Sequence, residues 1–344
     1  MILTIALFLS LVAFVLIAFL LWGWLLRLGL RLTRTHVISW RDIFSATAIS
    51  LGWSIFVALA FKFLLPQNDD AVLLEDLLKM AISVLGALFV IHLKFQTGAI
   101  SSFVAWLPTN LCGVVVLLFW SFIFVPFLFE CFRVPTGSMA PTLIGSNHQS
   151  RCPICNETCK CTAFPNTVRL ESFLPAPMIC ENFHISSHAD IPGEIYGGDC
   201  FVATKFLSPR RWDLMVFQHP ENPEQVLVKR LVGLPGETIH VENGVVHANG
   251  RPIELPKHLA SMKYEPLPQK PIPFPQANAT WDNPALLAED EFFVLGDFSV
   301  RALDSRYWKK GSVGHNPYAV PKSHIIGVAT HRFGAWDRWG VLWQ

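Results

Sequence analysis

The sequence predicts about four N-terminal transmembrane helices in residues 1–130, followed by a water-soluble domain in residues 131–344. Composition is the first observation behind this fold class. Of the 344 residues, 52% are hydrophobic and only 15% are charged, which is too apolar for an ordinary soluble protein of this length. The second observation is that the apolar excess lies before about residue 130, while nearly all of the proline-rich and polar sequence follows it.

Uncharged apolar segments mark the expected spans. Three of them are about long enough to cross a bilayer core, namely residues 2–26, 43–61 and 100–129. A shorter segment, residues 80–93, fits either a fourth span or a buried or interfacial helix. We interpret the first segment as a spanning helix and not as a cleaved leader, because it lacks a basic start and a small-residue cleavage site.

Charges between the spans predict the orientation, because Lys and Arg gather on the cytoplasmic side of short loops. The first loop holds Arg27, Arg31, Arg34 and Arg41. The second loop is acidic, with Asp69, Asp70, Glu75 and Asp76 before Lys79, and the third carries Lys94. With four spans the basic loops lie inside and the C-terminal domain lies outside. With three spans that domain would share the side of the arginine-rich loop.

A turn-rich segment follows the last span directly. Residues 130–143 read ECFRVPTGSMAPTL. Glycine and proline around Ser138 favour a turn, which could hold the serine hydroxyl exposed at a defined position. Taken alone, a Gly-Ser pair in a turn is usually only a turn, so a second feature is needed to make Ser138 a nucleophile candidate.

The second feature is a β-branched run, residues 225–237, which reads QVLVKRLVGLPGE and predicts a buried strand closed by a turn. Alternation along a strand places Leu227, Lys229 and Leu231 on one face. Burial disfavours the charged form of a lysine and lowers its pKa, so Lys229 could serve as a general base near physiological pH. The alternative is a lysine at a strand edge that reaches water.

Together these segments resemble the bacterial type I signal peptidases. Residues 138–143, SMAPTL, match the serine box of that family, and residues 229–237, KRLVGLPGE, match its lysine box. Further blocks are present in the family order: residues 212–217 before the lysine box, and residues 296–297, 304–306, 320–321 and 326–329 after it. Ordered blocks are far more specific than one motif. The resemblance covers nearly all of the chain after residue 129, apart from a Cys-rich insertion at about 145–196 and a Pro-rich insertion at about 251–290.

The resemblance implies a mainly β catalytic domain and a serine endopeptidase that removes N-terminal signal peptides without a cofactor for catalysis. Ser138 would attack the scissile carbonyl while Lys229 takes its proton. The family geometry implies an oxyanion site made by the backbone N–H of Ser138 and the hydroxyl of Thr136. By the same analogy, Asp297, Asp304 and Arg306 would support the site structurally.

Two departures from the family pattern lie near the expected site. The family commonly has Asn after Gly-Asp and a serine that orients the catalytic lysine, where this chain has Phe298 and Ala302. Ser299 or Ser305 could replace that serine. The alternative function is a catalytically impaired, peptidase-fold membrane receptor or a metal or redox sensor. A third hypothesis is a structural or transport-associated membrane protein, which the lack of ionisable clusters within the expected spans disfavours.

The Cys-rich insertion contains Cys152, Cys155, Cys159, Cys161, Cys180 and His184. A Cys-x-x-Cys pair with further soft ligands about 25 residues on suits a tetrahedral structural zinc site. The predicted ligands are Cys152, Cys155, Cys159 and Cys180, with Cys161 or His184 as alternatives. An oxidising outer face favours disulfides instead, and redox-active or unpaired thiols are the third possibility.

We therefore expect a multi-pass protein of the cytoplasmic (inner) membrane with its catalytic domain on the extracytoplasmic face. Its expected partners are the lipid bilayer and preproteins, whose Ala-x-Ala leaders the family resemblance implies. A net charge of +1 gives no electrostatic footprint for nucleic acid. The Pro-rich residues 251–284 are expected to form a long surface loop without a core of its own.

Overall fold

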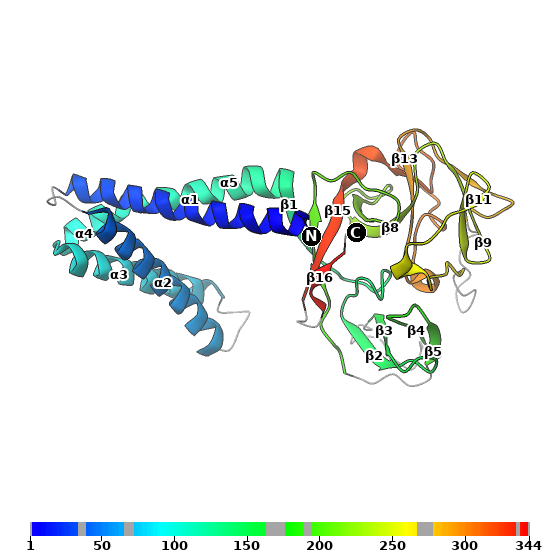
Figure 1. Ribbon diagram of the computed structural model, residues 1–344, viewed down its shortest axis with the longest axis horizontal. Helices are drawn as coiled ribbons and strands as arrows, with labels where there is room; N and C mark the ends of the chain where they lie inside the picture. Colours follow the sequence, from blue (N-terminus) through cyan, green and yellow to red (C-terminus); the bar gives the residue numbers. More distant parts are fainter. Residues whose placement is uncertain are drawn as a thin grey trace. The chain divides into compact units, whose positions relative to one another are not determined.

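The computed structural model describes residues 2–33, 39–64, 72–162, 176–188, 194–266, 278–334 and 338–342 (Figure 1). The chain forms two compact units, Met1–Phe124 and Val125–Gln344, and each is described by itself. The first is helical and the second is mainly β. Of the loop charges used to predict the orientation, Arg34, Asp69 and Asp70 lie outside the described residues.

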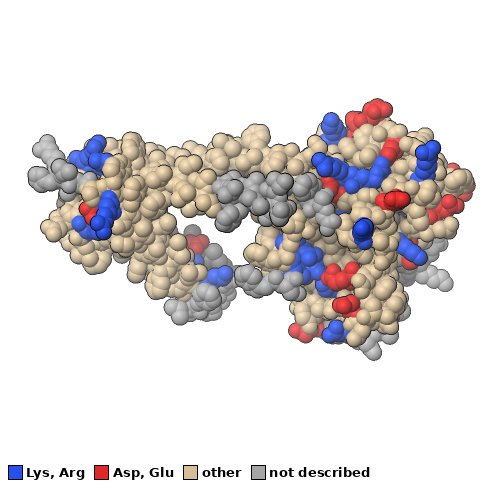
Figure 2. Space-filling model, viewed as in Figure 1, with Lys and Arg blue, Asp and Glu red and all other residues tan. Residues whose placement is uncertain are grey.

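The helical unit contains α1 (Ile2–Leu32), α2 (Trp40–Leu64), α3 (Val72–Phe95), α4 (Ala99–Trp106), the 3₁₀ turn η2 (Leu107–Thr109), α5 (Asn110–Phe119) and the start of the π-helix η3 (Trp120–Leu128). Among the residues that the structure describes, four stretches are long and apolar enough to cross a membrane: Val12–Leu32, Trp40–Lys62, Glu75–Phe95 and Ala99–Leu128. This confirms the prediction of about four helices. The short third segment is part of a longer helix. On its visible face the helical unit carries few charged side chains (Figure 2).

Small residues let these helices approach closely. A Cβ on Gly29 would lie 2.1 Å from the carbonyl oxygen of Ala105. A Cβ on Gly86 would lie 2.0 Å from the indole nitrogen of Trp53. Contacts of this kind are typical of helices that pack in a membrane. The last span is not one regular helix, because it contains proline at positions 108 and 126, and proline lacks the N–H that a regular α-helix needs.

The β unit is built on an eight-stranded antiparallel sheet in the described part of the chain, with the order β1-β6-β15-β7-β8-β13-β14 and β16 paired to β15. Its strands are β1 (Phe129–Arg133), β6 (Cys200–Thr204), β7 (Leu214–Gln218), β8 (Val226–Gly233), β13 (Glu291–Leu295), β14 (Val320–Pro321), β15 (Ile325–Phe333) and β16 (Gly340–Val341). The strand predicted around Lys229 is β8. The mainly β class is confirmed.

Two smaller sheets accompany it among the described residues. One has the order β11-β10-β9-β12 and is formed by β9 (Thr238–Glu242), β10 (Val245–Ala248), β11 (Arg251–Pro252) and β12 (Ala285–Leu286). The other has the order β2-β3-β4-β5 and is formed by β2 (Asn147–Arg151), β3 (Thr158–Thr162), β4 (Ala176–Cys180) and β5 (Ile185–His188). We name this second sheet with its turns, residues 147–162 and 176–188, the Cys module. It lies within the segment predicted as a Cys-rich insertion, about 145–196 (Figure 1).

Strand β7 separates two cores. Successive side chains of a strand point to opposite faces. Met215 and Phe217 therefore pack with Leu231 on one side, while Leu214 and Val216 pack on the other. The second core also contains Met139 and Leu143, which follow the candidate nucleophile in the sequence. The segment carrying Ser138 is thus anchored in the centre of the β unit.

The expectation of a coreless surface loop at residues 251–284 is wrong for its described part. Leu259, Met262 and Tyr264 are at most 2% exposed. They pack in one core with Ile239 and Val246. Proline breaks regular structure but does not stop the apolar residues between prolines from being buried. Residues 267–277 of this stretch lie outside the described residues.

Candidate active site

The serine segment lies in tight turns between β1 and β2. The N–H of Ala140 donates to the carbonyl of Gly137 (3.0 Å), and the N–H of Gly145 donates to the carbonyl of Thr136 (3.0 Å). Ser138 is half-buried and Thr136 is exposed. Because its apolar neighbours are held in the core, the segment can present the Ser138 hydroxyl at a fixed place, as a turn-rich sequence predicts.

Lys229 lies in the middle of β8, opposite Met215 of β7. Lys229 is only 3% exposed. Its Nζ lies 2.7 Å from the Oγ of Ser138, within hydrogen-bond distance. The structure therefore brings together the two residues that the sequence predicts as nucleophile and base, although 91 positions separate them in the chain.

Burial lowers the pKa of Lys229 from 10.5 to about 8, because desolvation disfavours the ammonium form. The carboxylates of Asp304 and Asp297 oppose this effect by favouring the charged form, and the guanidinium of Arg306 adds to it. A neutral amine is therefore accessible near physiological pH, and only a neutral amine can accept a proton from a serine hydroxyl.

A buried network around Asp297 ties three segments of the site together. Arg230, which is 2% exposed, donates through Nε to the Oδ1 of Asp297 (2.9 Å) and through a second nitrogen to its Oδ2. The hydroxyl of Thr142 donates to Asp297 as well (2.5 Å). Asp297 thus links the strand of Lys229 to the segment of Ser138. Arg230 was missed as a site residue, although a second charge inside an apolar strand was a signal for it.

Asp304 and Arg306 form a second buried pair. The Nε and one Nη of Arg306 each lie 2.9 Å from a carboxylate oxygen of Asp304. Asp304 also accepts the N–H of Gly296 (3.0 Å), and Arg306 donates to the carbonyl of Glu265 (2.8 Å). The pair fixes the loop after β13. In that loop the N–H of Phe298 donates to the carbonyl of Ser138 (3.1 Å).

Ala302 lies where that loop meets the serine segment, and it is fully buried. A Cβ on Gly296 would lie 2.3 Å from the Cβ of Ala302 and 2.8 Å from the carbonyl oxygen of Ser138, so only glycine fits there. The two serines named as replacements are engaged elsewhere. The hydroxyl of Ser299 donates to the carbonyl of Lys263 (3.1 Å), and that of Ser305 accepts the N–H of Val294 (3.0 Å). Within the described part of the chain, Lys229 is therefore hydrogen-bonded to Ser138, and neither Ser299 nor Ser305 takes the place of the family's orienting serine.

Comparison with known proteins identifies the family. A family model described as "Signal peptidase, peptidase S26" matches residues 163–336, half of the chain. The chain belongs to the signal peptidase family, peptidase S26. Membership confirms the resemblance found in the sequence.

The chain is also similar to several named proteins. A signal peptidase I of Leptolyngbya laminosa is 35% identical over 149 residues, 41% of this chain and 61% of the relative, which is less than two thirds of its length. A probable signal peptidase I-1 of Synechocystis is 29% identical over 175 residues, 48% of this chain and 76% of the relative. A solved signal peptidase I of Enterococcus faecalis is 31% identical, with a TM-score of 0.26, and the match covers 36% of this chain and 98% of that one.

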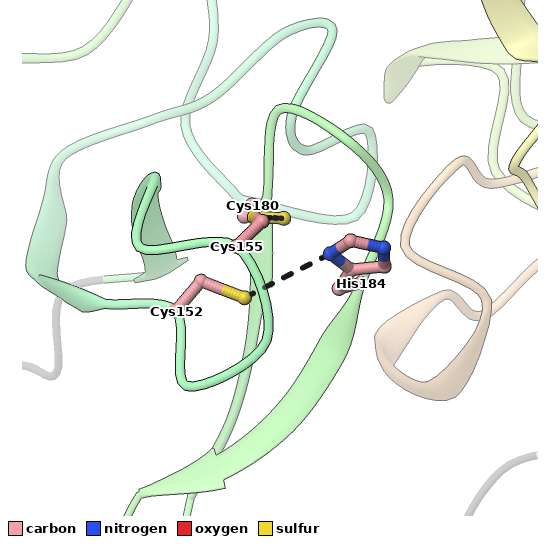
Figure 3. A group of neighbouring side chains, drawn as sticks. All are labelled: Cys152, Cys155, Cys180 and His184. Atoms are coloured by element: carbon pink, nitrogen blue, oxygen red, sulfur yellow. Dashed lines mark hydrogen bonds between the residues drawn. The ribbon is translucent and has the colours of Figure 1, made fainter.

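The Cys module gathers four candidate metal ligands, Cys152, Cys155, Cys180 and His184 (Figure 3). Their ligand atoms lie within 4.8 Å of one another. The Sγ of Cys152 lies 3.9 Å from the Nδ1 of His184, and the Sγ of Cys155 lies 3.7 Å from that of Cys180. All eight cysteines lie in described segments and are free thiols.

The ligand set thus differs from the predicted one at one position, where His184 replaces Cys159. The Sγ of Cys159 lies 3.7 Å from the hydroxyl of Ser186 instead. Cys159 is also inside β3, whereas the four gathered residues lie in turns or at strand ends. A residue in mid-strand has its direction fixed by the sheet, but a turn can aim two ligands at one point. Cys161, the other alternative, is likewise inside β3 and buried.

Two tight turns hold the ligand pairs. The N–H of Asn156 donates to the carbonyl of Cys152 (2.9 Å), and the N–H of Phe183 donates to that of Cys180 (2.9 Å). Burial of Cys152 raises the pKa of its thiol, but hydrogen bonds outweigh this effect and lower the pKa to about 7. The strongest of these hydrogen bonds comes from the backbone N–H of Cys155. Three sulfurs and one imidazole nitrogen are a donor set that suits tetrahedral zinc.

Proposed function

We propose that this chain is a membrane-bound serine endopeptidase that removes N-terminal signal peptides from exported preproteins, with Ser138 as nucleophile and Lys229 as general base. The single observation that carries the proposal is the 2.7 Å contact between the Ser138 hydroxyl and the buried amine of Lys229. Membership in the signal peptidase family supports the reaction class.

In the proposed mechanism, neutral Lys229 takes the proton of Ser138 as its oxygen attacks the scissile carbonyl. The resulting oxyanion accepts hydrogen bonds from the N–H of Ser138 and the hydroxyl of Thr136, and one such donor is typically worth about 3–4 kcal/mol. The ammonium of Lys229 then returns the proton to the leaving amine. Water, deprotonated by Lys229, hydrolyses the acyl-enzyme in the second half of the reaction.

In this proposal Asp297, Asp304 and Arg306 act as structural supports. Asp297 and Asp304 are each at most 1% exposed and are paired with arginine. A buried carboxylate paired in this way keeps its place through the reaction, because separating the pair would leave a buried charge uncompensated. The supports therefore hold Arg230, the neighbour of Lys229 on β8, and the loop after β13 in place.

We place the β unit on the extracytoplasmic face of the cytoplasmic membrane. Strand β1 begins at Phe129, directly after the last span ends at Leu128. Ser138 therefore follows the membrane closely in the sequence, and a cleavage site just beyond the apolar part of a leader lies near the same surface. The basic first loop and Lys94 support this orientation. Leaders of the Ala-x-Ala type are the proposed substrates.

The same proposal assigns a structural zinc ion to Cys152, Cys155, Cys180 and His184. To test it, metal content is measured by mass spectrometry on the purified full chain, and thiols are counted with and without reductant. We expect bound zinc in the wild type and loss of one equivalent in the double variant Cys155→Ser, Cys180→Ser. Cys131→Ser is the control, because Cys131 is exposed on β1. Thiols that appear only after reduction would show disulfides instead.

The activity is tested with the full chain in detergent and a preprotein substrate. We expect cleavage at the leader boundary by the wild type and nearly complete loss in Ser138→Ala and in Lys229→Ala. Lys310→Ala is the matched control, because the Lys310 side chain is 76% exposed. Unchanged cleavage by Lys229→Ala would refute the dyad. No cleavage by the wild type would favour the impaired receptor, which Ala302 motivates.

A further inference from the structure

The Cys module touches the serine segment next to the proposed nucleophile. Gly137 is buried, and its N–H donates to the hydroxyl of Thr162 (2.8 Å). Thr162 is the last residue of β3. A Cβ on Gly137 would lie 2.5 Å from this hydroxyl oxygen, so the two segments are as close as glycine allows. An insertion of the peptidase therefore supplies a hydrogen bond inside its active-site loop.

This hydrogen bond fixes the peptide that carries the proposed oxyanion donor. The N–H of Ser138 belongs to the peptide unit whose carbonyl is that of Gly137. That carbonyl accepts the N–H of Ala140 (3.0 Å), and Thr162 holds the N–H on the other side of the same glycine. Glycine is the most flexible residue, so both bonds are needed to define the direction of the Ser138 N–H.

A second contact joins the same two segments through apolar side chains. Ile179 of β4 packs with Ala140, Ile144 and Phe298, and all four are at most 1% exposed. Phe298 is one of the departures from the family pattern. Its ring is covered here by the Cys module, and its N–H donates to the carbonyl of Ser138 (3.1 Å). The module and this phenylalanine therefore form one packing unit beside the nucleophile.

A charged contact adds a third link. Glu181, the residue after Cys180, accepts hydrogen bonds from Lys160 (2.7 Å) and from Arg338 (2.8 Å). Arg338 in turn donates to the carbonyl of Pro141 (2.9 Å), inside the serine box. A chain of contacts thus runs from a candidate metal ligand to the serine segment.

The Cys module has little core of its own to hold these contacts in place. Its buried cluster consists of Cys152, Cys159, Cys161, Ala176, Met178 and Cys180. So small a set of side chains rarely orders a segment without a metal or a covalent cross-link. The pairing of Cys159 with Cys180 joins β3 to β4, so a metal on Cys180 would also order the strand that ends at Thr162.

We infer that the metal-bound Cys module positions the oxyanion peptide of the protease, with Thr162 as the positioning residue. This rests on the proposed function of Ser138 and Lys229 and on the proposed zinc site. Thr162 does not touch substrate. It acts through Gly137 on the direction of the Ser138 N–H, so its loss affects the transition state more than substrate binding.

The test compares Thr162→Val, Thr162→Ser and the control Thr158→Val at the other end of β3, each as the full chain in detergent. Valine keeps the shape of threonine but removes the hydroxyl, and serine keeps the hydroxyl. We expect kcat of Thr162→Val to fall about tenfold with KM nearly unchanged, and Thr162→Ser to retain most activity. Near-equal kcat for Thr162→Val and Thr158→Val would overturn the inference.

Metal removal is the second arm. Wild type and Thr162→Val are assayed before and after treatment with a zinc chelator, with metal content measured in parallel. We expect chelation to lower kcat of the wild type markedly and to lower kcat of Thr162→Val much less. Both perturbations act on the same contact, the hydrogen bond between Thr162 and Gly137, so their effects are not additive. Unchanged kcat in metal-free wild type would overturn the inference while leaving the peptidase proposal intact. No cleavage by untreated wild type would refute the proposed function first.

An independent observation concerns the β9–β10 hairpin. His240 and His247 are directly opposite in the strand register, and their rings are stacked with centroids 4.6 Å apart. Glu242 follows His240 by two positions and so shares its face. Ligand atoms of the three residues lie within 4.8 Å of one another. Two imidazoles and a carboxylate are a donor set for a transition metal.

The buried ring nitrogen of His240 is available to a ligand. His240 is only 5% exposed, and its Nε2 lacks a hydrogen-bond partner within the described part of the chain. An unpaired buried nitrogen is costly, so such atoms usually have a function. The Nδ1 of His247 lies 3.3 Å from the carbonyl of Val245, and donation there leaves the lone pair on its Nε2 for a metal.

We propose that His240, Glu242 and His247 bind a divalent transition-metal ion, separately from the Cys module. The test titrates Ni²⁺ by calorimetry into the full chain whose cysteine site has been saturated with Zn²⁺. We expect one further Ni²⁺ per chain, lost in His247→Ala and retained in the control His258→Ala, because His258 is exposed. No Ni²⁺ binding, or binding unchanged in His247→Ala, would overturn the proposal.

Discussion

Replacing Lys229 by methionine is expected to abolish proteolysis and at the same time to stabilise the protein. Burial lowers the pKa of this lysine from 10.5 to about 8. At pH 7 most of the amine is still charged, and holding it in the core costs about 3 kcal/mol at 1.36 kcal/mol per pKa unit. Methionine has a similar length and carries no charge. We therefore expect Lys229→Met to exceed the wild type in free energy of unfolding by about 3 kcal/mol at pH 7.

The sign of the pH dependence separates this cause from general packing. Between about pH 8 and 10.5 the folded wild type binds fewer protons at Lys229 than the unfolded chain does. Its stability therefore rises with pH in that window relative to the variant, and the difference of about 3 kcal/mol shrinks toward zero. This difference is measured by denaturant unfolding of the full-length wild type and Lys229→Met in detergent, followed by tryptophan fluorescence at pH 7 and 9.5.

Lys310→Met is the control, because the Lys310 side chain is 76% exposed and pairs with Glu221 at the surface. It should change stability by less than about 1 kcal/mol at either pH. A Lys229→Met protein that is less stable than the wild type at pH 7, or whose advantage is the same at pH 7 and 9.5, would refute the reasoning.

Three further outcomes follow from the same contacts. The kcat/KM of preprotein cleavage should rise with pH through about 8, as Lys229 loses its proton; a flat profile from pH 6 to 9 would contradict its role as base. Asp304→Asn should lower the free energy of unfolding by about 3–5 kcal/mol in denaturant titration, because Arg306 is left buried without its counter-ion. Gly296→Ala should lower both kcat and melting temperature, at a cost of about 1–3 kcal/mol, because its Cβ meets the loop and the nucleophile backbone. Gly340→Ala, with open space around it, should match the wild type in both measurements.

Features that depend on local sequence pattern were predictable. Hydropathy over long windows predicts the four spans, because crossing a bilayer requires a length and a composition that can be read directly. Alternation predicts that the strand around Lys229 is buried, and the leucine two positions after it is fully buried. The ordered boxes around Ser138 and Lys229 predict the family from the sequence alone, because spacing and order carry much more information than one motif.

Features that depend on contacts between distant segments were not predictable. Spacing alone could not choose His184 over Cys159, because the choice depends on which residues lie in turns. Nothing in the sequence indicates that Thr162 meets Gly137, 25 positions away. The burial of Tyr264 inside a proline-rich stretch has the same origin, since its neighbours come from the β9–β10 hairpin.

The apolar contact between Ile179 and Phe298 has a consequence for protein engineering. Shortening this enzyme to resemble a compact peptidase, by deleting residues 147–188, would uncover Ala140, Ile144 and Phe298 together. A contiguous apolar patch would then open beside the nucleophile, where it would invite aggregation or trap the leader of a substrate. A shortened version therefore needs polar replacements at these positions, and Phe298→Asn is the natural first choice.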